Sequence, residues 1–392
     1  MKVLSDLLTL DSTTLDPRIS TSLLNCVTSV TQGSELSLTA MGRMNGELNY
    51  AIEKHAIKRV DRLLKNPKLH QVRNIYYKMI ASYFASIKHP LIHVDWSTVY
   101  NYNFVMLRAA VSIDGRAIVI YEEVYPEKMH TSPVAQRTFL SNLAAILPVH
   151  VVPIICSDAG FKIPWFKNIE EHDWYWLART RGEVKCQLEG EDDWLAVHQH
   201  HKKASQSALE LPNLSLSKSH QFPCRGVLYK GKDKRRKNMN RQGIVTKDAI
   251  NAKHAKSAKE PWFLVSNLPA DKYLAHHLVN LYRRRMGIEE SFRDVKNEYY
   301  GLGLRRSKSR NIERLQIILL IAMLASFYLL MLGKAAEMEG LHRYFQANTI
   351  KNKRILSYVF LGRRIIKHRE YNLSEDLLIS AFSALIEESF YE

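Results

Sequence analysis

The stretch from Leu278 to Gly303, LVNLYRRRMGIEESFRDVKNEYYGLG, concentrates residue types that could do chemistry. If it forms a helix, each residue advances about 100° around the axis, so residues three, four or seven apart share a face. An acid flanked by cations and a phenol would then lie along one edge: Tyr282, Arg285, Glu289, Arg293 and Lys296. Beside this edge runs an apolar stripe that could dock on a core: Leu281, Ile288, Phe292, Val295 and Tyr299.

Two glutamates stand next to each other in this stretch, and only one shares the edge with the cations. Glu290 would lie about 100° away from Glu289, on a different face of the helix. We therefore expect Glu289 to be the functional acid. Taken alone, the pattern also fits a solvated helix surface with ion pairs between successive turns, which is common in proteins.

Two aspartates, Asp95 and Asp158, follow apolar runs that are typical of β-strands, LIHV and VVPIICS. We expect both at the C-terminal ends of strands, where α/β sheets place their ligand crevice. With Glu289 they would supply hard oxygen ligands for Mg²⁺, and two such ions can drive an in-line phosphoryl displacement. The alternative is that both aspartates only cap turns after strands.

The spacing Tyr282, Arg285, Glu289 and Lys296 resembles the Tyr-Arg-Glu-Lys signature of bacterial insertion-sequence DDE transposases. The similarity covers nearly the whole chain and includes VDWS at 94–97, SDAGFKIPW at 157–165 and AKEPWFLVSNLP at 258–269. It is closest to the cut-and-paste enzymes of the tetracycline-resistance composite transposon. The kanamycin-resistance transposon enzymes belong to the same class.

This resemblance implies an α/β fold with an RNase H-like mixed-sheet catalytic core, a β-rich insertion, and helical N-terminal and C-terminal regions. It implies that Asp95, Asp158 and Glu289 are the catalytic and metal-binding triad, with two Mg²⁺ ions that Mn²⁺ can replace. The reaction would be nicking, hairpin formation and opening, and strand transfer, carried out by a homodimer on paired transposon ends and target DNA.

Other residues would contact the DNA. The resemblance implies that Trp262 stacks on a flipped base, although a core tryptophan is the default for an aromatic in a strand. Met286 could wedge into the resulting gap. The cations Arg285, Arg293 and Lys296 would contact phosphates beside Tyr282.

The charge balance points to a polyanionic partner. The chain has 56 Lys and Arg against 39 Asp and Glu, a formal net charge of +17, and a pI of about 9.6. Four cysteines without a C-x-x-C pair argue against a zinc site and against a disulfide framework. The N-terminus lacks the pattern of a secretory signal, so we expect a cytoplasmic, nucleoid-associated protein.

The hydrophobic periodicity and the resemblance together divide the chain into five regions. The first, residues 1–90, is expected to be helical and DNA-binding, with a basic face of Lys54, Lys58 and Arg62, although a solvated cationic face fits this segment equally well. The remaining expected regions are the first part of the core at 91–182, the β-rich insertion at 183–270, the second part of the core at 271–335, and a helical C-terminal region for dimerisation at 336–392.

A run of 17 uncharged residues from Ile317 to Gly333 is near the lower limit for spanning a membrane. We favour a helix buried in an α/β protein, and hence no membrane partner, because charges flank the run directly and no second span follows. Three rival functions remain open at this point: a metal-dependent nuclease that does not rejoin DNA, an inactive domesticated DNA-binding regulator, and a membrane-associated protein.

Overall fold

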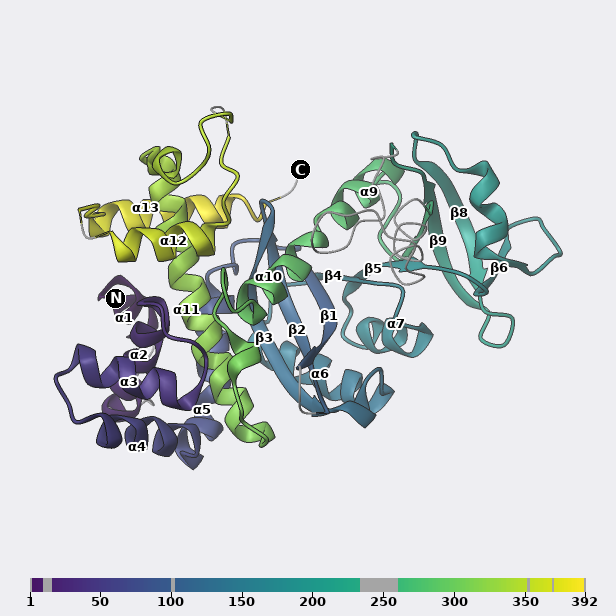
Figure 1. Cartoon of the computed structure of the whole chain (residues 1–392). Coiled ribbons are helices and arrows are strands. Elements are labelled where there is room, and N and C mark those ends of the chain that lie inside the picture. Colours follow the sequence, from purple (N-terminus) through teal and green to yellow (C-terminus); the bar gives the residue numbers. More distant parts are fainter. Residues whose placement is uncertain are drawn as a thin grey trace, which may run out of the picture. The chain divides into compact units, whose positions relative to one another are not determined.

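The computed structural model describes residues 2–9, 16–99, 103–232, 260–350, 353–368 and 370–390 (Figure 1). These residues form two compact units. The first combines residues 1–151 with 286–392, and the second spans residues 152–285. Most of the basic tract between Lys230 and Arg241 lies outside the described residues.

An antiparallel three-stranded sheet forms the centre of the first unit. Its strands are β1 (Leu91–Val99), β2 (Phe104–Ile113) and β3 (Arg116–Pro126), in the order β3-β2-β1. A tight turn at Asp114-Gly115 joins β2 to β3, and Gly115 adopts a positive φ of 66° there. Helix α6 (Pro133–Ile146) packs against β3.

Five helices precede the sheet, as the periodicity of residues 1–90 predicts. They are α1 (Lys2–Thr9), α2 (Pro17–Thr31), α3 (Leu38–Leu48), α4 (Glu53–Leu64) and α5 (Pro67–Ser82). Asp16, Ser37 and Asn66 cap α2, α3 and α5 with their side-chain oxygens. Helices α2, α4 and α5 pack against α11 (Ile312–Met338), so the N-terminal helices share one core with the sheet.

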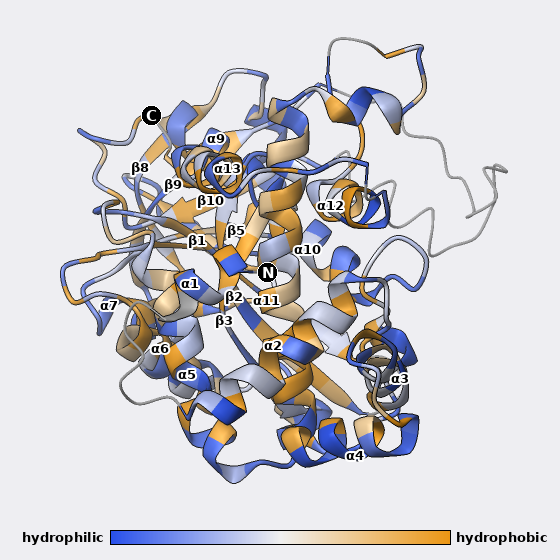
Figure 2. Cartoon of the chain, turned by 90° about the vertical axis from the view of Figure 1, so that its left-hand side faces the viewer, coloured by the Kyte–Doolittle hydropathy of each residue, from blue (hydrophilic) through white to orange (hydrophobic). Residues whose placement is uncertain are grey.

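Helix α11 is the most apolar element of the chain, and 94% of its most hydrophobic 18-residue stretch is buried inside the first unit. By length and composition alone it could cross a membrane, but here protein surrounds it, as we expected. Figure 2 shows the largely hydrophobic helix α11 running between the N-terminal and the C-terminal helices. Gly333 of α11 and Gly362 of α12 (Tyr358–Lys367) allow the two helices to approach closely. A Cβ on Gly333 would lie 2.1 Å from the Tyr358 carbonyl oxygen.

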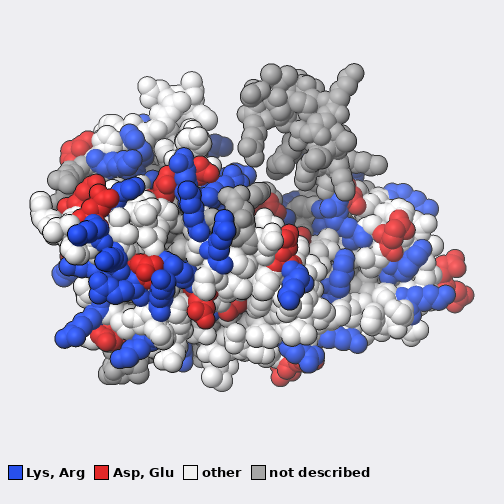
Figure 3. Space-filling view, turned by 60° about the horizontal axis from the view of Figure 1, so that its bottom comes forward, with Lys and Arg blue, Asp and Glu red and all other residues white. Residues whose placement is uncertain are grey.

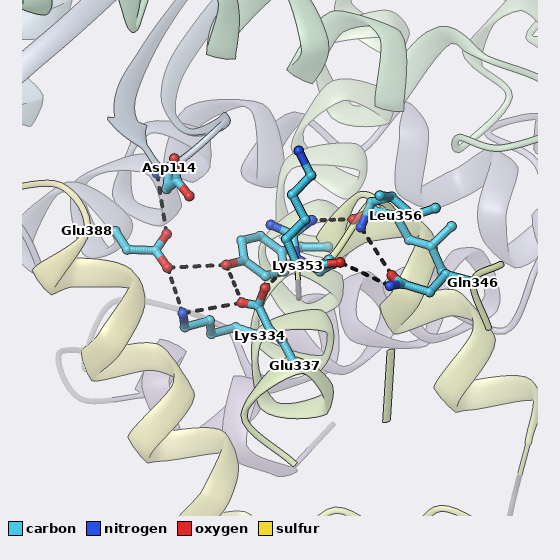
Figure 4. A network of polar contacts seen from close by, with 10 residues as sticks. Asp114, Lys334, Glu337, Gln346, Lys353, Leu356 and Glu388 are labelled. Carbon is cyan, nitrogen blue, oxygen red and sulfur yellow. Dashed lines mark hydrogen bonds and ion pairs between the residues drawn. The ribbon is translucent and has the colours of Figure 1, made fainter. Parts of the chain in front are cut away.

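A polar network closes the C-terminal region around the end of α11 (Figure 4). Lys334 Nζ donates to Glu388 at 2.7 Å, and the Tyr358 hydroxyl donates to Glu337 at 2.7 Å. The Arg354 guanidinium donates to Glu337 at 2.9 Å and stacks 3.6 Å from the Tyr358 ring centroid. These bonds join α11 and α12 to α13 (Glu375–Glu387), which ends just before Glu388.

The second unit is built on a mixed sheet in the order β4-β5-β10-β9-β8-β6-β7. Strands β4 (Ile154–Ser157) and β5 (Tyr175–Thr180) are parallel and joined through α7 (Ile163–Glu170). The insertion adds short antiparallel strands to β5: β10 (Trp262–Ser266), β9 (Phe222–Tyr229), β8 (Leu209–Leu216), β6 (Lys185–Leu188) and β7 (Leu195–Ala196). The insertion is rich in β-strands, as its sequence indicates. Its strands do not form a separate sheet but continue the sheet that contains β5.

Two local expectations are wrong. Strand β1 continues to Val99, so Asp95 lies in mid-strand; only the continuous buried run of Leu91 to Val94 ends before it. The stretch from Leu278 to Gly303 is also not one helix. It breaks at Arg284 and Arg285 into α9 (Ala275–Arg283) and α10 (Met286–Lys296).

The close crossing of α11 and α12 gives a stability prediction. In Gly333→Ala the new methyl group would meet backbone, which cannot rotate away, so the helices must separate. We expect the free energy of unfolding to fall by about 1–3 kcal/mol in chemical denaturation. Ala336→Gly, at a buried position of the same helix, should cost about 1 kcal/mol through helix propensity and about 0.8 kcal/mol more through the lost buried methyl group. A Gly333→Ala variant as stable as the wild type would contradict the crossing argument.

Candidate active site

A row of charged residues crosses the three strands of the first unit. In the strand register Asp95 of β1 stands opposite Arg108 of β2, and Arg108 stands opposite Glu122 of β3. Directly opposed residues of antiparallel strands share one face, so the three side chains project to the same side of the sheet. Arg108 and Glu122 are completely buried, while Asp95 is partly exposed at the edge of the row.

Helix α10 covers this face. The Arg108 Nη1 donates to Ser291 Oγ at 3.1 Å, and its guanidinium carbon lies 4.4 Å from the centroid of the Phe292 ring. One turn further on, Lys296 Nζ donates to Ser97 Oγ at 2.6 Å and to the Thr98 carbonyl at 2.5 Å. The end of α10 is thus attached to the strand that carries Asp95.

The two neighbouring glutamates of α10 have different surroundings. Glu289 precedes Phe292 by three residues and Lys296 by seven, which places it on the stripe that faces β1. Glu290 accepts a hydrogen bond from Arg293 at 2.8 Å and lies 3.9 Å from Arg116, at the start of β3. Helix periodicity thus puts Glu289 on the face shared by Phe292 and Lys296, whereas Glu290 belongs to an ion-pair cluster.

Lys296 is buried, although we expected it along an accessible edge. Only 8% of the residue is exposed. Burial, reinforced by Arg108 and Arg305, lowers the pKa of Lys296 to about 7, and Asp95 acts in the opposite direction. The bonds of Lys296 to Ser97 and Thr98 attach it to the strand that carries Asp95. Arg293, by contrast, is exposed and paired with Glu290.

In the second unit, Asp158 directly follows β4, as predicted. Its Oδ1 accepts a hydrogen bond from the Gly160 amide at 2.8 Å, which fixes the carboxylate in a tight turn. Asp158 and Arg285 both act on the hydroxyl of Tyr282, whose pKa burial raises well above its ordinary value. The Arg285 guanidinium lies 5.7 Å from the Tyr282 ring centroid.

Trp262 belongs to an aromatic group in the same unit. It is half-buried at the first position of β10, and its ring lies edge-on to Tyr282 at 5.0 Å between centroids. Tyr229, its cross-strand partner on β9, lies 5.9 Å away on the other side. The Tyr229 hydroxyl accepts a hydrogen bond from Arg283. Trp262 therefore has ring neighbours that hold it in place while part of its surface stays accessible.

The remaining candidate DNA contacts are exposed. Met286 is 49% exposed at the first position of α10. Lys54, Lys58 and Arg62 are exposed on α4 and form no ion pair within the described part of the chain. Figure 3 shows Lys and Arg side chains gathered over the face of the first unit that the N-terminal helices form.

Our sequence analysis did not identify Arg108, Glu122 or Tyr229. A signal for the first two exists, because each places a charge inside a strand of otherwise apolar residues, FVMLRAAVSI and RAIVIYEEVY. Such a charge must be paired when it is buried. For Tyr229 no signal exists, because its importance depends on the strand register that places it opposite Trp262.

Carboxylate oxygens are the ligands that suit Mg²⁺, and Asp158 already holds one oxygen in a fixed turn. Among the residues that the structure describes, no group of three His, Cys, Asp or Glu side chains is placed so as to hold a metal ion. Asp95 and Glu289 belong to the first unit, and Asp158 belongs to the second. A metal site shared by all three is therefore a proposal, considered below.

The mixed α/β architecture, with carboxylates on a strand, after a strand and on a helix, is consistent with an RNase H-like enzyme that acts on nucleic acid. Residues 88–326, well over half of the chain, match the family model of the transposase DDE domain, and the matched region contains Asp95, Asp158 and Glu289. The chain belongs to this family of transposases. Enzymes of the family act on DNA and use divalent metal ions. None of the curated proteins matches the chain.

The buried Lys296 predicts a pH dependence of stability. In the unfolded chain a lysine keeps its proton up to a pKa of about 10.4, whereas in the folded chain Lys296 loses it near 7. Between these values the unfolded state binds more protons, so the free energy of unfolding rises with pH. We expect Lys296→Met to remove a rise of up to about 1.4 kcal/mol per pH unit in urea unfolding between pH 7 and 9.5. The same slope in Lys296→Met and in the exposed control Lys58→Met would contradict this.

Proposed function

We propose that this protein is a cut-and-paste DNA transposase of the Tyr-Arg-Glu-Lys class, closest to the tetracycline-transposon branch. Asp95, Asp158 and Glu289 would form its catalytic triad. The observation that supports the proposal is the attachment of α10 to the sheet of Asp95: Lys296 bonds to β1 and Phe292 lies over Arg108, and helix periodicity puts Glu289 on the face of these two residues. The match to the transposase DDE domain supports it, since all three carboxylates fall inside the matched region.

The three carboxylates would hold two Mg²⁺ ions, with Mn²⁺ as a substitute. When bound, such ions activate the attacking oxygen and stabilise the leaving oxygen of a phosphodiester. The residues of the chain have the tasks of holding the carboxylates in place and orienting the DNA. Arg285 and Arg293 would contact phosphates, and Lys296, which is buried on β1, would keep the end of α10 on that strand.

The triad can be tested by single substitutions. We expect Asp95→Ala, Asp158→Ala and Glu289→Ala each to reduce cleavage of transposon-end DNA to background while binding of the ends persists, because binding depends on cations elsewhere. Gel analysis of cleavage with Mg²⁺ and a mobility-shift assay would measure the two properties.

Glu290→Ala is the matched control for Glu289→Ala. It removes a carboxylate from the same helix, but that carboxylate is engaged by Arg293 and lies near Arg116. Loss of such a pair costs about 1 kcal/mol or less, so cleavage should stay within about tenfold of the wild type. Inactivity of a folded Glu290→Ala variant would show that the assignment of Glu289 is wrong.

Recognition of the transposon ends is assigned to helices α3 and α4. A Cβ on Gly42 would lie 2.6 Å from the Ile57 Cα, so this glycine permits close packing of the two helices, and the solvated cations of α4 point away from them. The N-terminal helices share a core with α11, so recognition is better tested in the full chain than in a fragment.

In the triple variant Lys54→Gln, Lys58→Gln, Arg62→Gln we expect weaker end binding and a salt slope lowered by up to about three. The control removes three exposed lysines of the second unit, Lys167, Lys185 and Lys272, also by change to Gln. Titrations of labelled DNA at several salt concentrations measure both. An equal loss in the two triple variants would show that only net charge matters.

Trp262 is assigned to the hairpin step, in which it would stack on a base flipped out of the distorted duplex end, with Met286 near the gap. Loss of stacking costs about 1–3 kcal/mol per base, or roughly tenfold to more than a hundredfold in rate. We expect Trp262→Ala to nick normally and to form hairpins slowly. Trp262→Phe, or an abasic site at the flipped position, should restore part of the rate. If nicking and hairpin formation fall together, Trp262 only packs against Tyr229 and Tyr282.

The proposed partners are transposon-end and target DNA and a second copy of the chain in the paired-end complex, within the bacterial cytoplasm at the nucleoid and without a membrane. The same cleavage assays separate the rivals. A simple nuclease would cut the ends without forming hairpins or joining DNA, and an inactive regulator would bind the ends without cutting them.

A further inference from the structure

We propose that Arg108 is a positioning residue, which holds helix α10 and its Glu289 over the strand that carries Asp95. This inference rests on the proposed function, because it takes Asp95 and Glu289 as the reacting carboxylates. It assigns a role to a buried ion pair that lies beside them and that is not part of the Tyr-Arg-Glu-Lys signature.

The ion pair fixes the plane of the Arg108 guanidinium. Its Nε and Nη2 both donate to Glu122 Oε2, at 2.9 and 2.7 Å, and neither side chain is exposed to solvent. Arg108 stands directly opposite Asp95 of β1 on one side and opposite Glu122 of β3 on the other. The orientation of the guanidinium is therefore set by the sheet.

The remaining nitrogen of Arg108 binds the helix. Its Nη1 donates to Ser291 Oγ at 3.1 Å, two residues after Glu289, and the Phe292 ring lies flat over the cation at 4.4 Å. Ser291 Oγ in turn donates to the Ile288 carbonyl at 2.7 Å. The sheet thus holds the very turn of α10 that presents Glu289.

Two further contacts hold the ends of the helix. At its start, a Cβ on Gly287 would lie 2.4 Å from the Arg116 carbonyl oxygen, so the backbone of α10 sits directly on β3. At its end, Lys296 is bonded to β1. These contacts fix where the helix lies, and the Arg108–Ser291 bond in the middle limits its rotation about its own axis. Rotation is the movement that would turn Glu289 away from β1.

Stability alone does not account for a charged pair at this position. Two apolar residues of similar volume are often as stable as a buried ion pair or more so. What an apolar pair lacks is direction, because dispersion contacts tolerate a small rotation of α10 whereas a hydrogen bond to a fixed guanidinium does not. The pair therefore supplies orientation to the helix that carries the acid.

Ser291→Ala tests the inference with the smallest change, since it removes the acceptor for Arg108 and leaves the Arg108–Glu122 pair in place. The matched control is Ser29→Ala, which removes another buried serine that donates to a carbonyl of its own helix, at 2.9 Å, in α2. Arg108→Lys, which keeps the charge beside Glu122 but cannot also reach Ser291, is the second variant.

Hydrogen exchange of the full-length protein gives a readout that is independent of activity. In Ser291→Ala and Arg108→Lys we expect the amides of α10 to exchange about tenfold faster than in the wild type, corresponding to loss of one charge-assisted bond, with other helices unchanged. Single-turnover cleavage should fall by roughly tenfold to a hundredfold at unchanged affinity for DNA, because misplacement of a reacting group lowers the rate and not the binding. Ser29→Ala should change neither.

Two results would overturn the inference. One is that Ser291→Ala behaves like Ser29→Ala in both exchange and cleavage. The other is that α10 exchanges faster while cleavage keeps its wild-type rate, which would make the bond a packing feature only. Failure of the proposed function looks different: the wild type would then cleave no better than Asp95→Ala, whatever the exchange of α10 shows.

Discussion

The burial of helix α11 is the constraint on which the first unit depends. A helix that is apolar on every side is stable in water only when other elements cover its whole circumference, and each buried leucine or isoleucine contributes about 1.5–3 kcal/mol. The sheet covers one side through β3, and the rest is covered by α2, α4, α5, α12 and α13. Residues from both ends of the chain are therefore drawn into one core.

That core explains where buried polar groups occur. Where helices from distant parts of the sequence meet α11, ion pairs fix their contacts: Asp61 of α4 accepts from Arg314 at 2.5 Å, and Glu123 of β3 accepts from Arg73 of α5 at 2.7 Å and from Gln316 at 2.8 Å. The basic face of α4 is thus attached to the same helix that packs on the sheet of Asp95. A DNA end bound by α4 would be held by an element that is firmly joined to this sheet.

Much of this could be predicted from local pattern. The strands from Leu91 to Pro126, helix α6 and the burial of α11 follow from hydrophobic periodicity and a turn at Asp114-Gly115, because each depends on residues that are neighbours in sequence. The break at Arg284 and Arg285 could not be predicted, because arginine has a high helix propensity. The burial of Lys296 and the pairing of Arg108 with Glu122 depend on which strand lies under α10, and the period of a helix does not contain that information.

The break between α9 and α10 gives the four signature residues two different settings. Tyr282 and Arg285 belong to the second unit, with Asp158 and Trp262 as neighbours, whereas Glu289 and Lys296 belong to the first unit, on the sheet of Asp95. In the first setting the neighbours are aromatic rings and guanidinium groups, which suit the stacking of bases and the binding of phosphates. In the second the sheet carries Asp95 beside the buried Arg108, and carboxylate oxygens suit the holding of metal ions. Under the proposed function, the two-residue turn at Arg284 and Arg285 would join the part of the motif that orients DNA to the part that holds the metal ions.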